Sequence, residues 1–299
     1  MLFELNDYKM RKKKKSTYKI NYWILFLVIL LVLGLVLSRT RKASKRAVYR
    51  HPATEQPVES KKNEADTANK KVMHNIPEIC KELLLGKTEP ARDTNMVNIK
   101  SDYASGKGMF MHKEAYDAFK EMHKAAASDG INLTIISAMR TFNHQKRIWE
   151  NKWNGYQKLA GDVYATDIDD PVERAREILK YSAMPGTSRH HWGTDVDLNS
   201  LQNSYFESSK GKKVYKWLKK HAGIYGFCQP YTPHGKGREG GYEEEKWHWS
   251  YLPIAENYLK AFINNTNYDD IGGFNGHETA RKIDVINNYV MEIDEACKP

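Results

Sequence analysis

Two short segments of the chain carry residue types that bind metal ions. Residues 188–197 read SRHHWGTDVD, and residues 245–249 read EKWHW. The glycine in the first segment predicts a turn that brings His190, in a loop, close to Asp197 on the strand that follows. His248, on a second strand, would complete a set of two histidines and one carboxylate. A zinc ion accepts these three ligands, and a catalytic zinc keeps its fourth position for water.

Glu245 stands three residues before His248 and can accept a proton from a metal-activated water. Taken alone, each of these residues has a plainer explanation. A single histidine near tryptophan is usually a packed core residue, and a glutamate in the run 243–245 usually faces solvent. The four residues together, at this spacing, are more specific than any one of them.

The pattern Ser-x-His-x-x-Gly-x-x-x-Asp, followed by Glu-x-Trp-His, resembles that of the VanY-type zinc D-alanyl-D-alanine carboxypeptidases. These are LAS-type metallopeptidases with the hedgehog/D-Ala-D-Ala peptidase fold, a group that also includes D-Ala-D-Ala dipeptidases and L-alanyl-D-glutamate endopeptidases. Residues 137–145, SAMRTFNHQ, are similar to a third segment of the family, Ser-Gly-Tyr-Arg-Ser-x-x-x-Gln. The resemblance covers roughly residues 95–265, and its three motifs come in the family's order.

This resemblance implies a metal centre and a catalytic base. One zinc ion per chain would be held by His190, Asp197 and His248, which occupy the positions of the family's ligands. Glu245 occupies the position of the base. The resemblance also implies that the substrate is the stem peptide of peptidoglycan.

The same resemblance implies three residues that act on the substrate. Arg140 would bind the substrate's terminal carboxylate through two parallel hydrogen bonds, or would stabilise the tetrahedral oxyanion. The plainer alternative for Arg140 is a surface salt bridge. Gln145 and Ser188 would be further substrate contacts.

The chain departs from the family pattern at Asp195, where the family usually has alanine. Asp195 and Asp197 would face the same side of a strand. Asp195 would then either orient a ligand histidine through a hydrogen bond or pair with a nearby arginine or lysine. The Ser-x-His spacing selects His190 as the ligand, so we expect His191 to be a neighbour of the site.

The function that this pattern favours is a zinc-dependent carboxypeptidase that removes the terminal D-alanine from peptidoglycan stem peptides, as a D,D- or an L,D-carboxypeptidase. Two alternatives stay open. One is an L-alanyl-D-glutamate-type endopeptidase of the same polymer, and the other is a non-catalytic zinc-containing module that binds the cell wall. We expect residues 151–169 and 234–241 to border the cleft and to set specificity.

The segments that must position these residues alternate between short strands and helices. Strands are predicted over 133–137, 194–198 and 246–251, and the last would turn His248 to the site and its tryptophans to the core. Without regular crossover helices, this order predicts an α+β fold with a small, mainly antiparallel sheet flanked by helices and the zinc site on the sheet face. Helices are predicted over 113–127, 141–153, 170–181, 213–221, 253–263 and 278–296, with Thr141 or Asn143 as the cap of the second.

Three cysteines, Cys80, Cys228 and Cys297, are too few for a disulfide scaffold. They allow one bridge, with three pairings. Their separation does not predict a cysteine-based zinc site.

Positive charge is concentrated at the N-terminus. Residues 1–50 hold 13 Lys/Arg but only two acidic residues, whereas residues 51–299 hold 34 Lys/Arg and 35 Asp/Glu, a net charge of −1. Nucleic-acid binding needs basic residues on the folded domain, so nucleic acid is not expected as a partner.

An apolar run of 16 residues without charge, Tyr22–Leu37, lies between two basic clusters. We expect a basic cytoplasmic tail over 1–20, a transmembrane signal anchor over 21–38, a stalk over 39–75 and the zinc peptidase domain over 76–299. The alternatives for the run are a cleaved signal peptide and a buried helix. Peptidoglycan lies outside the cytoplasmic membrane, so we expect a single-pass protein with its N-terminus inside and its catalytic domain periplasmic or extracellular.

Overall fold

The computed structural model of the chain describes residues 79–235 and 237–298. The tail predicted over 1–20, the membrane anchor over 21–38 and the stalk over 39–75 lie outside these residues. Within the described residues, no helix combines the length and the apolar character that crossing a membrane requires.

Antiparallel strands form two small sheets. The four-stranded sheet has the order β3-β4-β6-β5, with β3 at Ile135–Ser137, β4 at Asp195–Leu198, β6 at His248–Tyr251 and β5 at Phe227–Cys228. The second sheet pairs β1 (Met96–Asn98) with β2 (Phe110–His112). The predicted α+β class with a small antiparallel sheet is therefore confirmed. Each of the three predicted strands starts one or two residues later than expected.

The register of β4 and β6 sets up the polar face of the sheet. Asp197 lies opposite His248, and Asp195 lies opposite Ser250. Residues directly opposite on antiparallel strands share a face, so these four side chains lie together. The intervening residues of β6 point the other way, and Trp249 is buried in the core as predicted.

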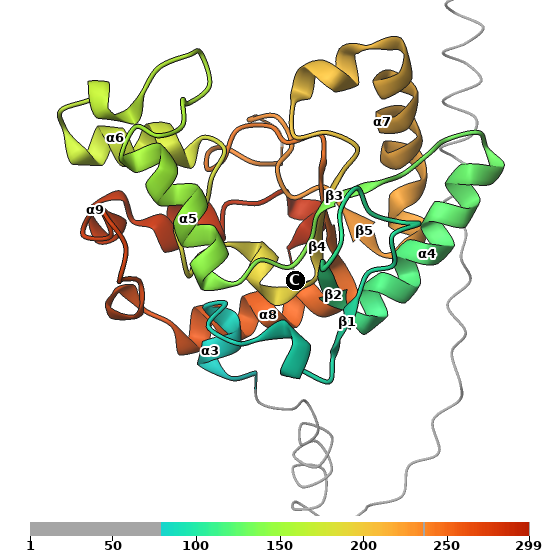
Figure 1. Cartoon of the computed structure of the whole chain (residues 1–299), viewed down its shortest axis with the longest axis horizontal. Helices are drawn as coiled ribbons and strands as arrows, with labels where there is room; N and C mark the ends of the chain where they lie inside the picture. The colour runs from blue at the N-terminus through green and yellow to red at the C-terminus, as the bar shows by residue number, and fades with distance from the viewer. Residues whose placement is uncertain (1–78, 236, 299) are drawn as a thin grey trace, which may run out of the picture. The chain divides into compact units, whose positions relative to one another are not determined.

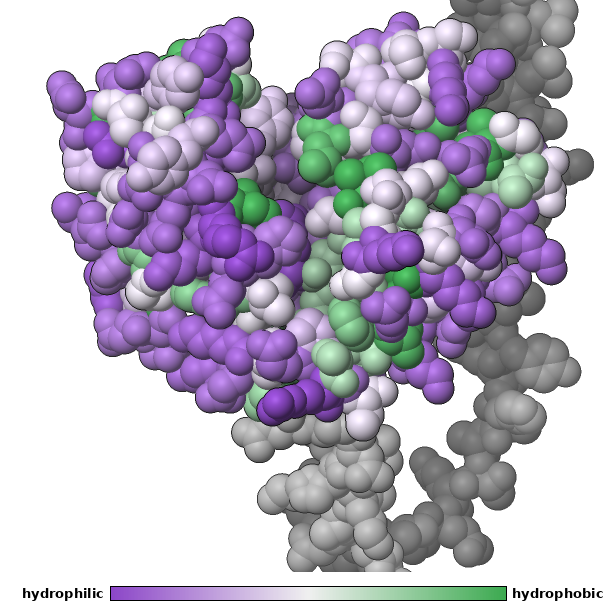
Figure 2. Space-filling view, in the orientation of Figure 1, coloured by the Kyte–Doolittle hydropathy of each residue, from purple (hydrophilic) through white to green (hydrophobic). Residues whose placement is uncertain are grey.

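Seven α-helices surround the sheets in the described part of the chain. In Figure 1, α5, α6 and α9 lie on one side of the four-stranded sheet, and α4 and α7 lie on the other. Figure 2 shows this face of the protein hollowed between the two groups. The helices are α3 (Lys81–Leu84), α4 (Lys113–Ser128), α5 (Phe142–Trp153), α6 (Pro171–Leu179), α7 (Ser209–His221), α8 (Leu252–Asn265) and α9 (Thr279–Ile283).

Side-chain caps explain where α5 and α6 begin. Thr141 accepts a hydrogen bond from the backbone N–H of His144, so Thr141 and not Asn143 is the cap of α5. Asp170 accepts from the N–H groups of Val172 and Glu173 at the start of α6. These caps fix the entry points of both helices.

Two apolar clusters hold the elements in place. One packs α5, α6, α8 and α9 around side chains such as Trp149 and Phe262. The other packs α4 and α7 on the apolar face of the sheet, with Phe119 and Trp249 fully or almost fully buried. Because this second cluster occupies one face of the sheet, the polar residues of β4 and β6 are left on the other.

The single helix predicted over 278–296 is wrong. Helix α9 ends at Ile283 because Asp284 adopts a left-handed conformation, with φ 56°. The Asp284 carboxylate accepts hydrogen bonds from the Tyr268 hydroxyl and from the Asn287 side chain, and these local contacts favour the break. A π-helical turn and a short 3-10 helix, Glu295–Cys297, follow. Helix α7, in contrast, starts four residues earlier than predicted, at Ser209.

A disulfide bond joins Cys228 on β5 to Cys297 near the C-terminus, with their Cα atoms 5.7 Å apart. This selects one of the three pairings that the sequence allowed. Cys80 is exposed and free. The bridge attaches the last described turn of the chain to the edge of the four-stranded sheet.

Candidate functional site

The structure brings the three predicted metal ligands together. Donor atoms of His190, Asp197 and His248 all lie within 4.8 Å of one another, and the three side chains are buried. His190 Nε2 is 3.3 Å from Asp197 Oδ1, and His248 Nδ1 is 3.4 Å from the same oxygen. His190 comes from a 3-10 turn, and the other two come from neighbouring strands.

Two atoms of this cluster have no hydrogen-bond partner among the described residues. They are His190 Nε2 and Asp197 Oδ1, and both are buried. Buried polar atoms without a partner are costly and need an explanation. A metal ion between them would satisfy both atoms, so the donor set fits zinc.

His190 is held in the form that a metal requires. Its Nδ1 donates to the backbone oxygen of Ala138 over 2.8 Å, which directs the lone pair of Nε2 towards Asp197. Burial, reinforced by the nearby Arg140 cation, lowers the pKa of His190 to about 4. The imidazole is therefore neutral at pH 7 and free to ligate through Nε2.

His248 uses its two ring nitrogens differently. Nε2 lies 2.9 Å from Asp195 Oδ2, while Nδ1 faces Asp197 and lies 3.2 Å from Glu245 Oε2. Burial by itself lowers the pKa of His248, but the hydrogen bonds to Asp195 and Glu245 outweigh it and raise that pKa to about 9. A metal ion bound at Nδ1 would therefore displace a proton.

Asp195 does both things that the sequence left open. It accepts a hydrogen bond from His248, and it also pairs with Arg189, whose Nε lies 3.0 Å from Oδ2. Its second oxygen accepts from the hydroxyls of Thr194 and Ser250. Burial alone would raise the pKa of Asp195, but Arg189 and His248 more than offset this and keep the carboxylate charged.

Glu245 lies at the edge of the cluster with only 6% of its surface exposed. It is not part of β6, because residues 246 and 247 form a turn in which the His248 N–H donates to the Glu245 carbonyl over 3.3 Å. The turn, rather than a strand, sets the three-residue offset between the two side chains. Burial raises the pKa of the Glu245 carboxyl above its ordinary value.

Arg140 follows β3 and reaches the same cluster. Its backbone N–H donates to the carbonyl of His190, and its Nη2 lies 3.7 Å from Asp197 Oδ2. Its Nε is buried and has no hydrogen-bond partner among the described residues. The side chain thus contacts a predicted metal ligand instead of forming a surface salt bridge.

His191 is a neighbour of the site, as expected. Its Nδ1 donates to the Arg140 carbonyl over 2.6 Å, and its Nε2 accepts from the Gly186 N–H over 3.0 Å. Both ring nitrogens are therefore engaged with backbone. His191 therefore helps to fix the backbone at Arg140 and is not positioned as a metal ligand.

A small cavity of about 30 Å³ opens beside the cluster. Ser188 borders it, but the side chain of Gln145 is fully buried behind its wall, where Nε2 donates to the Ala183 carbonyl over 2.8 Å. Several wall residues were not predicted from the sequence, because they come from loops without a motif. The cavity is lined by Arg140, Tyr181, Ser182, Ala183, Ser188, Arg189, His190, Tyr231, Tyr242, Glu245 and His248.

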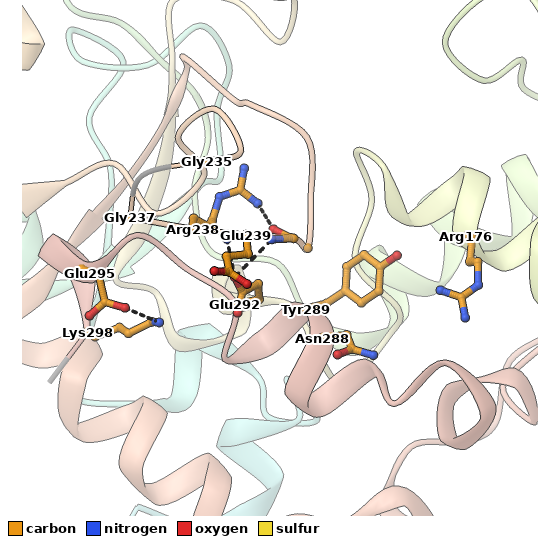
Figure 3. A pocket seen from close by; sticks show the side chains of 12 residues that line it. Arg176, Gly235, Gly237, Arg238, Glu239, Asn288, Tyr289, Glu292, Glu295 and Lys298 are labelled. Atoms are coloured by element: carbon orange, nitrogen blue, oxygen red, sulfur yellow. Dashed lines mark hydrogen bonds and ion pairs between the residues drawn. The ribbon is translucent and has the colours of Figure 1, made fainter.

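Residues 234–241 were expected to border this cavity, but 235 and 237–241 line a larger one, of about 760 Å³ (Figure 3). The other expected border, residues 151–169, contributes no residue to the lining of the small cavity. Glu292 lies beside the loop 237–241 and accepts hydrogen bonds from the N–H groups of Glu239 and Gly240. The next residue of the chain, Tyr242, borders the small cavity, and its ring packs on Tyr289 of the larger one. Tyr242 therefore connects this loop to the wall of the small cavity.

Comparison with known proteins identifies the family. Residues 108–254 match the family described as VanY, D-alanyl-D-alanine carboxypeptidase. This segment, just under half of the chain, belongs to the VanY family. The matched range contains all three segments that carry the resemblance, 137–145, 188–197 and 245–248.

Two curated relatives illustrate how far the VanY similarity extends. YodJ of Bacillus subtilis is 32% identical over 145 residues, which is 48% of this chain and 46% of that protein. The D-alanyl-D-alanine carboxypeptidase of Enterococcus faecalis is 31% identical over 135 residues, 45% of this chain and 46% of that protein. The chain thus spans about half the length of these relatives.

Among solved structures, a vancomycin-resistance D,D-pentapeptidase VanY in complex with Zn(II) is 24% identical and aligns with a TM-score of 0.42. The alignment covers 64% of this chain and 92% of that one.

Proposed function

We propose that this VanY-family chain is a zinc-dependent carboxypeptidase that removes the terminal D-alanine from peptidoglycan stem peptides. One observation carries the proposal. His190, Asp197 and His248 converge with two unpartnered donor atoms, and the buried carboxylate of Glu245 lies 3.2 Å from His248 Nδ1 at the wall of a cavity. A metal site next to an available base and an open cavity is the arrangement that metal-assisted hydrolysis needs.

Under this proposal His190, Asp197 and His248 hold one zinc ion per chain. When bound, the ion would lower the pKa of a water molecule and polarise the scissile carbonyl. Glu245 removes a proton as the water oxygen bonds to the carbonyl carbon. The same carboxyl then delivers that proton to the nitrogen that leaves as the C–N bond breaks. One water is consumed, and the products are a shortened peptide and free D-alanine.

The environment of Glu245 suits this work. Burial raises its pKa, which makes the carboxylate a stronger base than an exposed glutamate. Its backbone is fixed by a hydrogen bond from its N–H to the Tyr231 carbonyl over 2.9 Å. The side chain is therefore held close to the ligands before substrate arrives.

Arg140 supplies positive charge at the cavity wall. Its unpartnered Nε and its distance of 3.7 Å from Asp197 leave donors for an anionic group of the substrate. That group is either the terminal carboxylate or the developing oxyanion. Ser188 contacts the substrate from the same wall, whereas Gln145 acts on it through Ala183.

The proposed layout keeps the tail over 1–20, the anchor over 21–38, the stalk over 39–75 and the peptidase domain over 76–299. The substrate lies outside the cytoplasmic membrane, which places the domain in the periplasm or outside the cell. Fractionation of cells, followed by protease treatment from the outside, tests this. Recovery in the soluble cytoplasmic fraction would refute it.

The decisive experiment is mass spectrometry of purified muropeptides after incubation with the full-length protein in detergent. Loss of one terminal alanine supports the carboxypeptidase. A cut between L-alanine and D-glutamate would make the chain an endopeptidase, and wall binding without any cut would make it a binding module. The Glu245→Gln variant is the matched control, and elemental analysis should find about one zinc per chain.

A further inference from the structure

Lys152, near the end of α5, is a partly buried cation that has no acidic partner among the described residues. Its Nζ donates to the Ser182 hydroxyl over 2.5 Å, and no carboxylate of the described residues lies within ion-pair distance of it. Lys146, on the same helix, instead lies 3.8 Å from Glu150. Buried charges are normally paired, so the environment of Lys152 needs an explanation.

The charge of Lys152 interacts electrostatically with two residues of the catalytic cavity, Glu245 and Arg140. Burial lowers the pKa of Lys152, attraction by Glu245 raises it, and repulsion by Arg140 lowers it. Glu245 and Arg140 both line the cavity. An ammonium group has three donors, and the Ser182 contact uses one of them.

Ser182 connects Lys152 to the cavity. Its side chain lines the wall, with 6% of the residue exposed. Because the Ser182 oxygen accepts from Lys152, its own proton must point elsewhere, and no acceptor for it is found in the described part of the chain. The hydroxyl is therefore free to donate to a group in the cavity.

This pair is built on a rigid element. Lys152 and Gln145 are seven residues apart, which places them two turns apart on one face of α5. They contact neighbouring wall residues, Ser182 and Ala183. The wall therefore takes its position from the helix, and a donor held on a helix is placed more accurately than one on a loop.

We propose that Lys152 and Ser182 form a carboxylate subsite on the wall of the catalytic cavity. Ser182 contacts the carboxylate, and Lys152 supplies the charge. This inference rests on the proposed function, because it takes the ligand to be a peptide substrate. The carboxylate is either the peptide's C-terminal one or one on the residue before the scissile bond. The chemistry is the same, and the experiment separates the two sources.

The test measures peptide binding by calorimetry in the zinc-loaded Glu245→Gln background, so that peptides stay intact. Three peptides are compared: a stem peptide, its C-terminal amide, and the same peptide with its internal carboxylates amidated. We expect Lys152→Met to weaken binding of the stem peptide by roughly ten- to hundredfold, the loss expected for a hydrogen bond to a charged group. The peptide whose affinity does not change identifies the carboxylate that Lys152 recognises.

Matched variants keep the result interpretable. Arg147→Met removes a cation from an exposed position of α5 and should leave all three affinities unchanged. Lys152→Arg keeps the charge and should recover part of the affinity. Ser182→Ala is a smaller change at the wall, and it should weaken binding of the same peptides as Lys152→Met.

Two results would overturn the subsite. One is an unchanged affinity of Lys152→Met for all three peptides. The other is an equal loss for all three, since that is the effect of a distorted wall and not of a lost carboxylate contact. Binding does not depend on turnover. If the selective loss is found but wild-type protein cuts no muropeptide, the subsite stands and the proposed function fails.

Discussion

The carboxylate of Asp195 lies 2.9 Å from His248 Nε2, on the ring edge away from the nitrogen that faces Asp197. Asp195 and Asp197 lie two residues apart on β4 and contact opposite edges of the His248 ring. Asp195 is itself held by Arg189, which also donates to Ser250 over 2.7 Å. Where the family usually has alanine, this chain has a charged network that orients a predicted ligand.

This relationship predicts a loss of metal affinity in Asp195→Asn. The amide keeps the shape but removes the charge that stabilises His248, so zinc affinity should fall by roughly 10- to 100-fold. Competition with a chromophoric chelator measures it. Asp129→Asn is the control, because Asp129 only accepts from Trp217 on the far side of the sheet's apolar cluster. Equal zinc affinity in wild type and Asp195→Asn would show that the contact has no influence on the metal.

Glu245 should separate catalysis from metal binding. Glu245→Gln removes the base but none of the three ligands, so activity should fall by roughly 10²- to 10⁴-fold while zinc content stays the same. Muropeptide hydrolysis and elemental analysis measure the two quantities. Glu243→Gln is the neighbouring control and should keep its activity. If Glu243→Gln were the inactive variant, the assignment of the base would be wrong.

Periodic and motif-bearing parts of the fold could be predicted from the sequence. The apolar face of α4 and the capping residue Asp170 correctly predicted helices α4 and α6. The alternation of residues along β6 correctly predicted that Trp249 points to the core and His248 to the site. The spacing of the family motif correctly predicted that His190, Asp197 and His248 lie together. The two helices and the alternation on β6 depend on residues close together in the chain, whereas the metal cluster joins two distant segments and was found through the family resemblance.

The remaining features depend on contacts between distant segments. The break at Asp284 needs Tyr268 beside it, and the pairing of Cys228 with Cys297 needs the C-terminal turn to lie on the sheet edge. The contact of Lys152 with Ser182 joins segments 30 residues apart that share no motif. Local patterns hold no information on such contacts, so none of them was predicted.

Gly86 should be much less tolerant of alanine than Gly130. Both have left-handed backbones, with φ 71° and 72°, so a side chain costs about 1–2 kcal/mol at either. A Cβ at Gly86 would also lie 2.3 Å from His191 Nδ1, whereas one at Gly130 meets nothing within 4 Å. Urea unfolding should show a clearly larger loss of stability for Gly86→Ala. Equal losses would mean that the His191 ring moves aside without cost.

The disulfide should stabilise the protein substantially. It closes a loop with a sequence separation of 69 residues, and its removal by Cys228→Ser with Cys297→Ser should cost about 4 kcal/mol in the chain-entropy model. Denaturant unfolding under oxidising conditions measures the loss. A reductant should destabilise wild type by a similar amount and leave the double variant unchanged. Cys80→Ser, at an exposed free cysteine, should have no effect.

His191 should make the protein sensitive to mild acid. Burial lowers its pKa to about 3 in the folded protein, against 6.5 for the ordinary side chain. As the pH falls below 6.5, the unfolded chain binds a proton that the folded protein does not. The free energy of unfolding therefore decreases towards pH 3, by at most about 1.4 kcal/mol per pH unit from this residue.

The stability contributed by a neutral His191 is thus fully present above pH 6.5 and is lost below it. His191→Gln cannot bind the proton, so its free energy of unfolding should fall less steeply than that of wild type between pH 6 and pH 4.5. The variant will be less stable near pH 7.5, because the hydrogen bonds to Arg140 and Gly186 are weakened. The difference in the free energy of unfolding between wild type and His191→Gln should then decrease as the pH falls. Urea unfolding at a series of pH values measures it, and parallel curves would mean that His191 is not the residue responsible.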